Sequence, residues 1–318
     1  MKLDSYEFHK LKALRGSRTT STAADPMKTL QKAYEMFFTA DDVSAFREQS
    51  KALQLDRIDL TFLLLLRYPE GNFVRDEEYF IQKKNFEIVR KKKIVSLSYT
   101  LTVVDEVQNY LPEQIALLRS CVSDKTKSML YVGDLAQQVL LGTLHRWEDA
   151  GEVLPDDRKV ALEKVYRSTK QILLYVKHLG FPVMVPEGLR EGAEVVEMIG
   201  DSLEDEVDWI REQLLSDTGA QIGILGFDEN TLAPFREAFK ENAKVHILTV
   251  HQSQGVEFDT VYLVGIHQGM FEDRKEMDEN LAAERAKIQR DLIYVGLTRA
   301  MDKLSIVGSR SLKSILHC

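Results

Sequence analysis

Cysteine and long apolar runs are both scarce in this sequence of 318 residues. The two cysteines, Cys121 and Cys318, have no metal-ligand spacing and give no disulfide framework, which fits a reducing compartment. The most apolar run, residues 60–66, is far shorter than the roughly 20 residues that span a bilayer. The amino terminus lacks the apolar core of a signal peptide. We therefore expect a cytoplasmic protein with no membrane partner.

An excess of positive charge is also absent. The formal net charge is −8, so the surface as a whole does not attract polyanions, and any nucleic-acid binding must be local to a groove. The hydrophobic fraction of 44% and the charged fraction of 29% are ordinary for a soluble protein. The length allows two domains and a sizeable core.

Residues 1–93 have a polar, helical pattern. The segment Thr39-Ala-Asp-Asp42 predicts a cap for a helix that starts near Val43, and residues 56–67 predict a buried helix because their apolar run is rich in leucine. Residues 83–93 hold a basic cluster around Phe86. It could contact nucleic acid, but the general rule for charge runs favours a solvated helix face.

From Ile94 onward, strand-like runs alternate with helix-like runs, which predicts a parallel sheet with helices on both faces. Ser168 and Ser202 stand where N-caps belong, Asp205 completes a capping box with Ser202, and a domain boundary is expected near residues 180–182. The expected strands are 101–104, 128–132, 160–165, 183–185, 193–199, 221–225, 245–250, 260–264 and 304–307, and the expected helices are 114–120, 169–179, 203–215, 232–241 and 283–300.

Two carboxylates follow the first of these strands. Residues 101–104 form a short apolar run that predicts a buried strand, and Asp105 and Glu106 stand at its carboxyl end. Ligands of open α/β sheets bind outside that end. One carboxylate can hold Mg²⁺ and the other can orient or deprotonate a water. Taken alone, the pair is equally compatible with a helix cap or a solvated turn.

Two further segments have polar side chains suited to phosphate. Gly133-Asp134 ends the next strand, and Gln137 beyond it can sense a phosphate oxygen or a water, although Gly-Asp turns are common. Arg167 comes directly before a predicted helix start, where a guanidinium can clamp phosphate with paired donors. In isolation, a surface arginine is the simpler interpretation.

The carboxyl-terminal part adds two more segments. In residues 249–259, Gly255 permits close backbone approach, Glu257 offers an acceptor for a ribose hydroxyl, and His251 can donate to a phosphate backbone, although a lone histidine is more often structural. Arg299 follows an apolar helical stripe in residues 290–300. It could act as an arginine finger, worth about 10³–10⁵ in rate for phosphoryl transfer, or lie on a helix surface as an ordinary cation.

The order and the amino-acid sequences of these five segments resemble the later motifs of superfamily 1 helicases of the UvrD/Rep class, over roughly residues 100–310. The most specific matches are Gly-Val-Glu-Phe-Asp (255–259), Tyr-Arg-Ser-Thr (166–169) and Tyr-Val-Gly-Leu-Thr-Arg-Ala (294–300). The wording Val-Asp-Glu-Val-Gln-Asn-Tyr (104–110) is also similar to the branch that remodels bacterial RNA polymerase.

The resemblance implies the use of ATP and Mg²⁺ and a grip on single-stranded nucleic acid, DNA more than RNA. It implies two RecA-like lobes: a helical region at 1–93 that is a remnant of the first lobe and its insertion, a partial first lobe at 94–180, and a second lobe at 181–318. The implied site residues are Asp105 for the metal, Glu106 as catalytic base, Gln137 as γ-phosphate sensor, Arg167 and Arg299 on phosphate, Gly255 and Glu257 on the nucleotide, and Thr249 and His251 on nucleic acid.

The phosphate loop of that family has no counterpart in the sequence. Walker A ends in Gly-Lys-Ser/Thr, and the first 100 residues contain only Gly16 and Gly71, neither in such a loop. We therefore expect an ATP-dependent helicase or translocase present as a fragment, a truncated form or one chain of a split enzyme, which does not turn over ATP by itself. A separate chain with a Walker A loop is then an expected partner. The alternative is a non-catalytic, helicase-derived module that binds nucleic acid or RNA polymerase.

Overall fold

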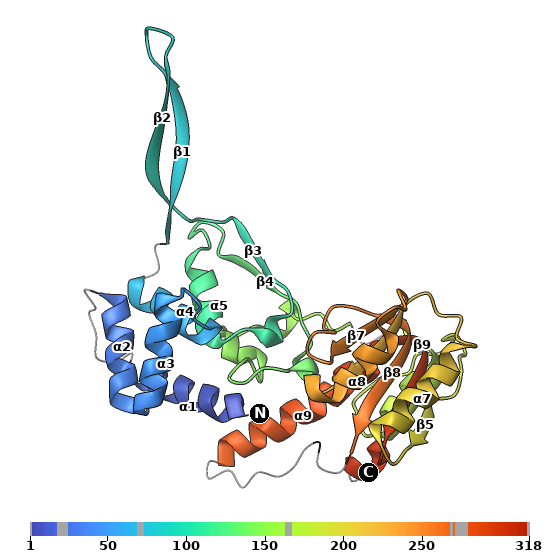
Figure 1. The fold of residues 1–318 in the computed structure, drawn as a ribbon. Helices are drawn as coiled ribbons and strands as arrows, with labels where there is room; N and C mark the ends of the chain where they lie inside the picture. Colours follow the sequence, from blue (N-terminus) through green and yellow to red (C-terminus); the bar gives the residue numbers. More distant parts are fainter. Residues whose placement is uncertain are drawn as a thin grey trace. The chain divides into compact units, whose positions relative to one another are not determined.

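The computed structural model describes residues 2–17, 25–68, 73–162, 167–267, 270 and 279–316, shown in Figure 1. It divides the chain into two compact units. The amino-terminal unit comprises residues 1–135 and 140–155, and the carboxyl-terminal unit comprises residues 136–139 and 156–318. The expected division into domains at residues 93 and 180 stays a prediction. Within the described ranges, no helix combines the length and apolarity that crossing a bilayer requires.

Four helices open the amino-terminal unit: α1 (Lys2–Ser17), α2 (Pro26–Phe37), α3 (Ala40–Lys51) and α4 (Arg57–Arg67). The predicted cap at Thr39 is confirmed as a capping box with Asp42, and the helix begins at Ala40. Asp56 caps α4 with its side chain alone, which accepts from two backbone N–H groups of the first turn. The predicted helix at 56–67 is therefore also confirmed, but it is buried on one face only, since Leu60 and Leu64 are exposed. The four helices enclose one apolar core that includes Leu11, Tyr34, Phe46 and Phe62.

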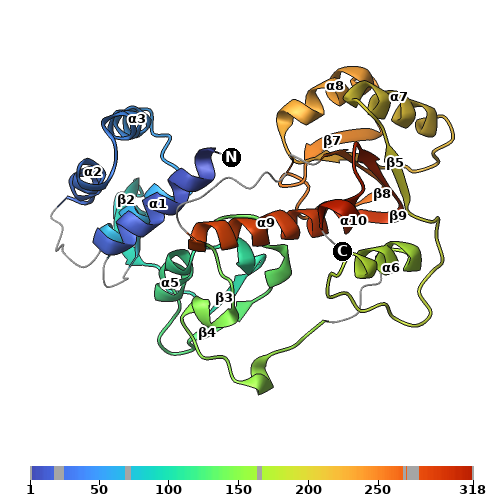
Figure 2. The same cartoon turned by 90° about the horizontal axis from the view of Figure 1, so that it is seen from below.

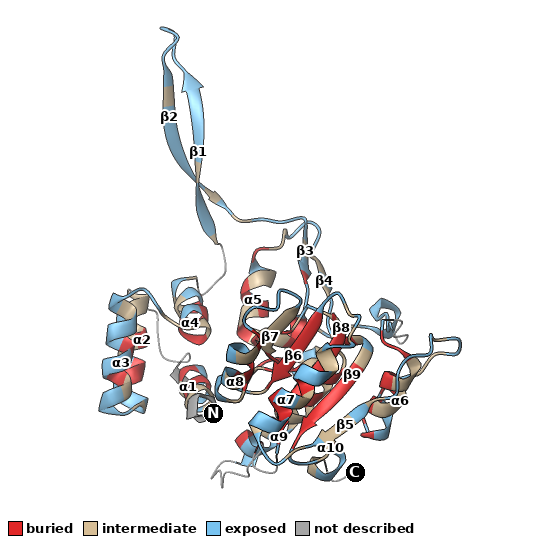
Figure 3. Cartoon of the chain, turned by 45° about the vertical axis from the view of Figure 1, so that its right-hand side comes forward, coloured by how far each residue is buried: buried red, intermediate tan, exposed pale blue. Residues whose placement is uncertain are grey.

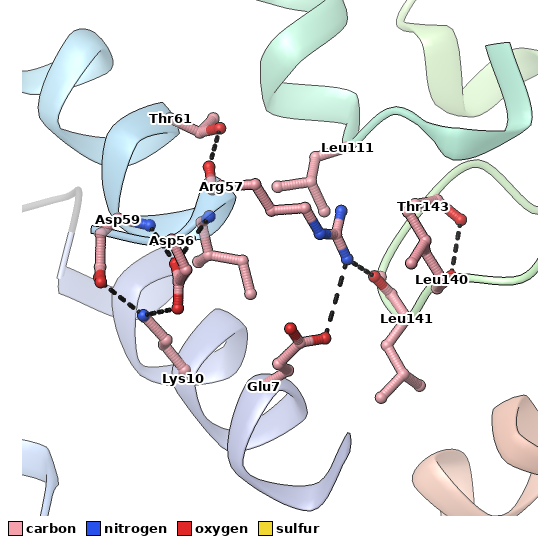
Figure 4. Close-up of polar contacts among 12 residues, drawn as sticks. Glu7, Lys10, Asp56, Arg57, Asp59, Thr61, Leu111, Leu140, Leu141 and Thr143 are labelled. Carbon is pink, nitrogen blue, oxygen red and sulfur yellow. Dashed lines mark hydrogen bonds and ion pairs between the residues drawn. The ribbon is translucent and has the colours of Figure 1, made fainter. Parts of the chain in front are cut away.

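A buried lysine lies at the centre of this helical core. The Nζ of Lys10 lies 2.5 Å from Oδ2 of Asp56 and 2.7 Å from Oδ2 of Asp59, and the Lys10 and Asp59 side chains are almost completely buried (Figure 4). The hydroxyl of Tyr34 donates to Oδ1 of Asp59 at 2.8 Å. Burial raises the pKa of the Asp59 carboxyl, and Lys10 opposes that shift. The cluster therefore depends on its lysine to compensate buried negative charge.

Arginine side chains fasten the segment 140–143 to the helices of the same unit. Arg57 donates from Nη2 to the Leu141 carbonyl at 2.9 Å (Figure 4). Arg15 pairs with Glu113 at 2.7 Å and also donates to the Gly142 carbonyl at 3.3 Å. These bonds to backbone carbonyls hold a segment that has no regular secondary structure of its own.

A long β-hairpin follows the helices, and it corrects the helical expectation for residues 83–93. Strands β1 (Val74–Gln82) and β2 (Ile88–Ser96) pair antiparallel from Val74 opposite Ser96 to Gln82 opposite Ile88. The turn is closed by the Lys83 N–H, which donates to the Glu87 carbonyl at 2.8 Å. Pairs between the two strands stabilise the hairpin, and these pairs include β-branched residues of β2. The sequence of residues 83–93 alone does not show them, because the partners lie in β1.

Strands β3 (Leu101–Val104) and β4 (Ser128–Tyr131) form a two-stranded parallel sheet beside α5 (Pro112–Ser120). The predicted strand at 101–104 is confirmed, but the prediction that it is buried is wrong. Leu101 and Val103 are more than half exposed, because α5 and the segment 147–150 cover the face that carries Val104. Short 3₁₀ turns occur at Val107–Asn109 and Trp147–Ala150 in this unit, with others at Leu135–Gln137 and Asp156–Arg158.

The carboxyl-terminal unit is built on a five-stranded parallel sheet with strand order β5-β9-β8-β6-β7. Its central strands are buried on both faces, as Figure 3 shows. This confirms the α/β class and the parallel sheet expected from alternating strands and helices. The strands are β5 (Val196–Ile199), β6 (Ile222–Gly226), β7 (Val245–Thr249), β8 (Phe258–Ile266) and β9 (Ala300–Gly308).

Helices cover both faces of this sheet, as predicted. In Figure 2, α7 and α8 lie on one side, and α6 and α9 lie on the other. Val207 of α7 and Phe235 of α8 belong to the core against β6 and β8. Ser202 caps α7 through the predicted box with Asp205. The helices are α6 (Lys170–His178), α7 (Leu203–Leu214), α8 (Glu229–Phe239), α9 (Glu279–Leu297) and α10 (Leu312–Ile315).

Several local expectations in this unit were wrong. Residues 183–185 form no strand, because prolines at 182 and 186 flank them. Residues 160–162 are an exposed loop, and the rest of the strand expected at 160–165 lies outside the described residues. The N-cap of α6 is Thr169, one residue beyond Ser168, whose hydroxyl donates to the Ala300 carbonyl at 2.8 Å. Ala300 itself begins β9 instead of ending a helix.

Candidate functional site: two sets of motif residues

In the amino-terminal unit, the acidic pair leaves the carboxyl end of β3 in a fixed turn. The Glu106 N–H donates to Oδ1 of Asp105 at 2.9 Å, and Glu106 has a left-handed backbone with φ of 50°. Gln108 joins this turn to the next one: its Nε2 donates to Oε2 of Glu106 at 2.6 Å, and its Oε1 accepts from Asp134 N–H at 3.1 Å. A Cβ at position 133 would lie 2.4 Å from that Oε1, so only glycine fits beside Gln108.

This donor set fits a hard cation. Asp105 and Glu106 are exposed carboxylates at the end of a strand, and Mg²⁺ takes oxygen ligands from one or two carboxylates together with substrate phosphates. Among the described residues, no group of three or more histidine, cysteine or acidic side chains could hold a metal by itself. A cation at this turn would therefore need further oxygen ligands from outside these two side chains.

In the carboxyl-terminal unit, Arg299 lies between the end of α9 and the start of β9, almost fully buried. Its guanidinium donates to the carbonyls of Val295 at 3.2 Å and Val256 at 3.3 Å. Its Nη2 also donates to Oε1 of Gln137 at 3.3 Å. A helix-surface cation is therefore excluded, because this guanidinium is positioned by three acceptors inside the unit.

Arg167 lies in the same part of this unit. It forms an ion pair with Glu257, which lies one residue before β8. The Arg167 side chain is 74% exposed. Glu257 is also one residue from Val256, whose carbonyl binds Arg299. The amino ends of the adjacent strands β8 and β9 thus bring Arg167, Glu257, Arg299 and Gln137 into one chain of contacts.

The loop between β7 and β8 holds the other predicted residues. Thr249 ends β7 and is buried, and its hydroxyl oxygen accepts from the Gln252 N–H at 3.2 Å. His251 is exposed in the turn that follows. Gly255 has φ of 76°, a left-handed conformation that favours glycine, and open space surrounds the position of a Cβ. The loop therefore presents His251 and Gly255 outward, while Thr249 holds the loop in place.

Two residues that hold the segments of the candidate site in place were not predicted from the sequence. Gln108 connects the two turns of the amino-terminal unit, and its only sequence signal was its position two residues after Glu106. Asp291 of α9 is buried, accepts from the Gln138 N–H at 3.3 Å and pairs with Lys287 at 2.5 Å. It thereby ties the segment that carries Gln137 to α9. The signal available in the sequence was an acidic residue directly beside the apolar run at 292–297.

Comparison with protein families gives one match in the carboxyl-terminal unit. Residues 225–311 match the UvrD-like helicase C-terminal domain. The matched range contains Thr249, His251, Gly255, Glu257 and Arg299, and it extends from the end of β6 to the loop after β9. The other four predicted site residues, Asp105, Glu106, Gln137 and Arg167, lie outside this range.

Curated relatives are DNA helicases that this chain matches over short stretches. DNA helicase II of Escherichia coli K12 is 42% identical over 62 residues, which is 20% of this chain and 8% of that protein. PcrA of Leuconostoc citreum, an ATP-dependent DNA helicase, is 43% identical over 68 residues, which is 21% of this chain and 8% of that protein. DNA helicase II of Haemophilus influenzae Rd is 30% identical over 139 residues, which is 43% of this chain and 18% of that protein.

Among solved structures, the C-terminal domain of a possible DNA helicase from Lactobacillus plantarum WCFS1 aligns with a TM-score of 0.35 and 25% identity, over 48% of this chain and 92% of that one. The matches to the curated relatives span only 8% to 18% of those proteins' lengths. In residues 225–311 the chain carries a UvrD-like helicase C-terminal domain, and its relation to DNA helicase II, PcrA and Rep is distant and partial.

Proposed function

We propose that this chain supplies part of the ATP-hydrolysis site of a UvrD/Rep-type helicase or translocase and lacks the phosphate loop. The observation that carries the proposal is the hydrogen bond from Arg299 to Gln137, together with the ion pair of Arg167 and Glu257 in the same unit. These contacts join segments more than 80 residues apart in sequence. Each side chain is of the type that phosphoryl transfer requires, a donor or an acceptor at a developing charge.

The proposed roles follow from the chemistry of each side chain. Arg299 would present its guanidinium to the transferring phosphoryl group, because burial and three acceptors hold it without reorganisation. Arg167 is exposed and would exchange Glu257 for phosphate, which leaves Glu257 to accept from a ribose hydroxyl. The Gln108 amide would orient Glu106, and Glu106 would accept a proton from the attacking water. Mg²⁺ on Asp105, when bound, would neutralise charge on the β- and γ-phosphates.

The proposed partner is single-stranded DNA in preference to RNA, since the curated relatives are DNA helicases. His251 would contact the nucleic-acid backbone from its exposed turn, with Thr249 beneath it. A second polypeptide with a Walker A loop would complete the nucleotide site. The interpretation as two RecA-like lobes, the first one incomplete, belongs to the same proposal, as does a cytoplasmic location.

One observation favours a second candidate function. The sequence has no Gly-Lys-Ser or Gly-Lys-Thr anywhere, so the lysine and backbone amides that normally cradle phosphates are not encoded in it. A non-catalytic module that binds nucleic acid or RNA polymerase would retain the same fold without turnover.

Nucleotide contact by the two arginines can be tested by ligand-observed NMR at millimolar MgATP, which detects weak binding. Saturation transfer to ATP should be seen with the wild-type chain and should fall to background in Arg167→Ala and Arg299→Ala. Arg211→Ala is the matched control, because Arg211 is an exposed arginine of α7 that pairs with Asp208. Equal transfer in all four proteins would contradict the proposal.

A further inference from the structure

The β1–β2 hairpin concentrates positive charge in a chain whose net charge is negative. Residues 79–93 contain six lysines and arginines and a single carboxylate, Glu87, whereas the whole chain has a net charge of −8. The cations are Lys83, Lys84, Arg90, Lys91, Lys92 and Lys93. A local cationic surface of this kind is the feature that polyanion binding requires in an acidic protein.

Ion pairs within the hairpin compensate only part of this charge. Glu77 pairs with Lys93 at 3.2 Å, and Lys83 pairs with Glu87 at 3.0 Å. Glu78 is shared between Arg90 and Lys92. These pairs are solvent-exposed, so each holds its partner weakly and leaves the cations available for exchange with a stronger anion.

On each face of the ribbon, one aromatic side chain lies opposite one of these cations. The strand register places Phe80 opposite Arg90 on one face and Tyr79 opposite Lys91 on the other. Phe80 is 68% exposed, and Phe86 in the turn is 82% exposed. Phe86 also has φ of 64°, a left-handed conformation that is unfavourable for a bulky residue. Rings this exposed leave much of their apolar surface open to a partner.

The hairpin extends away from the helices of its own unit (Figure 1). The parts of both strands that lie far from these helices are exposed on both faces (Figure 3). Its base is anchored: the Leu97 N–H donates to the Phe73 carbonyl at 2.7 Å, and the Phe73 ring packs on the helical core beside Tyr68. Nine-residue strands reach ~30 Å at the usual rise. An isolated two-stranded hairpin is at best marginally stable in water, so an arm of this length suits a surface that a partner covers.

We propose that the distal hairpin, residues 79–93, is a binding arm for single-stranded nucleic acid. Its lysines contact phosphates, and Phe80 and Phe86 stack on bases. Charge complementarity selects a polyanion, and the exposed rings select a single strand because only unpaired bases offer their faces for stacking. This site goes beyond the proposed nucleotide site, shares no residue with it and does not depend on it.

The proposal is tested by fluorescence anisotropy of a labelled oligothymidylate at low salt, without nucleotide. The triple variant Lys84→Ala/Lys91→Ala/Lys92→Ala should bind about tenfold more weakly or worse than wild type. The slope of log K against log salt should become less steep by about 2, since each lost phosphate contact on a single strand contributes about 0.7. Phe80→Leu, which removes the ring and keeps an apolar side chain, should weaken binding by about tenfold.

Two controls separate the arm from general charge loss and from misfolding. Lys28→Ala/Lys32→Ala/Lys51→Ala removes three exposed lysines from α2 and α3 of the same unit and should bind as wild type. Lys84→Arg/Lys91→Arg/Lys92→Arg keeps the charge and should also bind as wild type. The proposal is overturned if wild type does not bind the oligonucleotide or if the triple alanine variant binds as well as wild type. It is also overturned if the alanine variant loses affinity only for a protein such as RNA polymerase. Because no nucleotide is present, these results are independent of the proposed ATP site.

Discussion

Arg299 donates from Nη2 to Oε1 of Gln137 at 3.3 Å, although 162 positions separate the two residues in the chain. The contact connects the start of β9 with the short segment 136–139, which belongs to the same carboxyl-terminal unit. A buried guanidinium that reaches a side-chain amide beside two backbone carbonyls is held in one orientation. This fixed orientation makes Arg299 the central residue of the proposed phosphate contacts.

Replacing Arg299 by lysine should destabilise the carboxyl-terminal unit. An ammonium cannot serve the Val256 and Val295 carbonyls and Gln137 together, and buried acceptors that lose their donor cost roughly 1–3 kcal/mol each. Urea denaturation of Arg299→Lys should therefore show a free energy of unfolding lower by about 1–3 kcal/mol. Arg211→Lys on α7 is the control and should be neutral. An unchanged unfolding midpoint for Arg299→Lys would show that the bonds contribute little.

Asp105→Ala should abolish any Mg²⁺-dependent component of nucleotide binding. A hard cation needs oxygen ligands, and the protein supplies few others at this turn. In calorimetric titrations, wild type should bind MgATP more tightly than ATP in EDTA. The variant should bind both with the same affinity. Asp124→Ala, which removes an exposed carboxylate of the same unit, should retain the difference. Identical Mg²⁺ dependence in wild type and Asp105→Ala would remove Asp105 from the metal site.

The stability of the carboxyl-terminal unit should depend on pH through Glu206 of α7. Burial raises the pKa of this carboxyl from 4.5 to about 7, opposed by a hydrogen bond from the Gly265 N–H at 2.9 Å. The folded state therefore binds the proton more tightly than the unfolded state, and stability falls as pH rises through this window. The total change is about 3 kcal/mol, at 1.36 kcal/mol for each pKa unit.

Glu206→Gln isolates this contribution because the amide oxygen can still accept from Gly265 while carrying no charge. Thermal unfolding at pH 8 should show the variant to be more stable than wild type, and the difference should vanish near pH 4.5. Glu212→Gln, an exposed glutamate of the same helix, should follow the wild-type profile. A constant offset between Glu206→Gln and wild type at all pH values would contradict the assigned cause.

Lys10→Met should destabilise the amino-terminal unit strongly. Without the ammonium, Asp59 is left buried with only Tyr34 as a hydrogen-bond donor among its described partners, and breaking a buried pair costs about 3–5 kcal/mol. Denaturant unfolding should show this loss at neutral pH and a smaller loss in acid, where Asp59 is neutralised. Lys28→Met, at an exposed pair with Asp25, should change stability by less than about 1 kcal/mol. A loss for Lys10→Met no larger than that of the control would refute the role of Lys10.

Local signals predicted much of the secondary structure. The capping boxes at Thr39 and Ser202 and the apolar run at 101–104 depend only on residues within a few positions, so a single sequence reveals them. Burial of that strand could not be predicted in the same way, because cover for Leu101 and Val103 depends on which distant segments pack there. The basic run at 83–93 was misinterpreted because its strand pairing depends on partners at 74–82.

The candidate site was predictable in its residue types more than in its contacts. The sequence motifs around Glu257 and Arg299 singled out both residues, whose roles stay predictions, and the family match covers that region. The pairing of Arg167 with Glu257 and of Arg299 with Gln137 depends on how β8, β9 and the segment 136–139 meet. Gln108 was missed because an amide that bridges two turns leaves no periodic pattern.

The steady-state rate of ATP hydrolysis tests the proposed function most directly. The chain alone, with MgATP and single-stranded DNA, should show no turnover above background. The missing phosphate loop removes several charge-assisted hydrogen bonds worth roughly 1.5–3 kcal/mol each. Turnover should appear when a polypeptide with a Walker A loop completes the site, and Glu106→Gln should abolish it. Turnover of about 1 s⁻¹ or faster by this chain alone, lost in Glu106→Gln, would contradict the account.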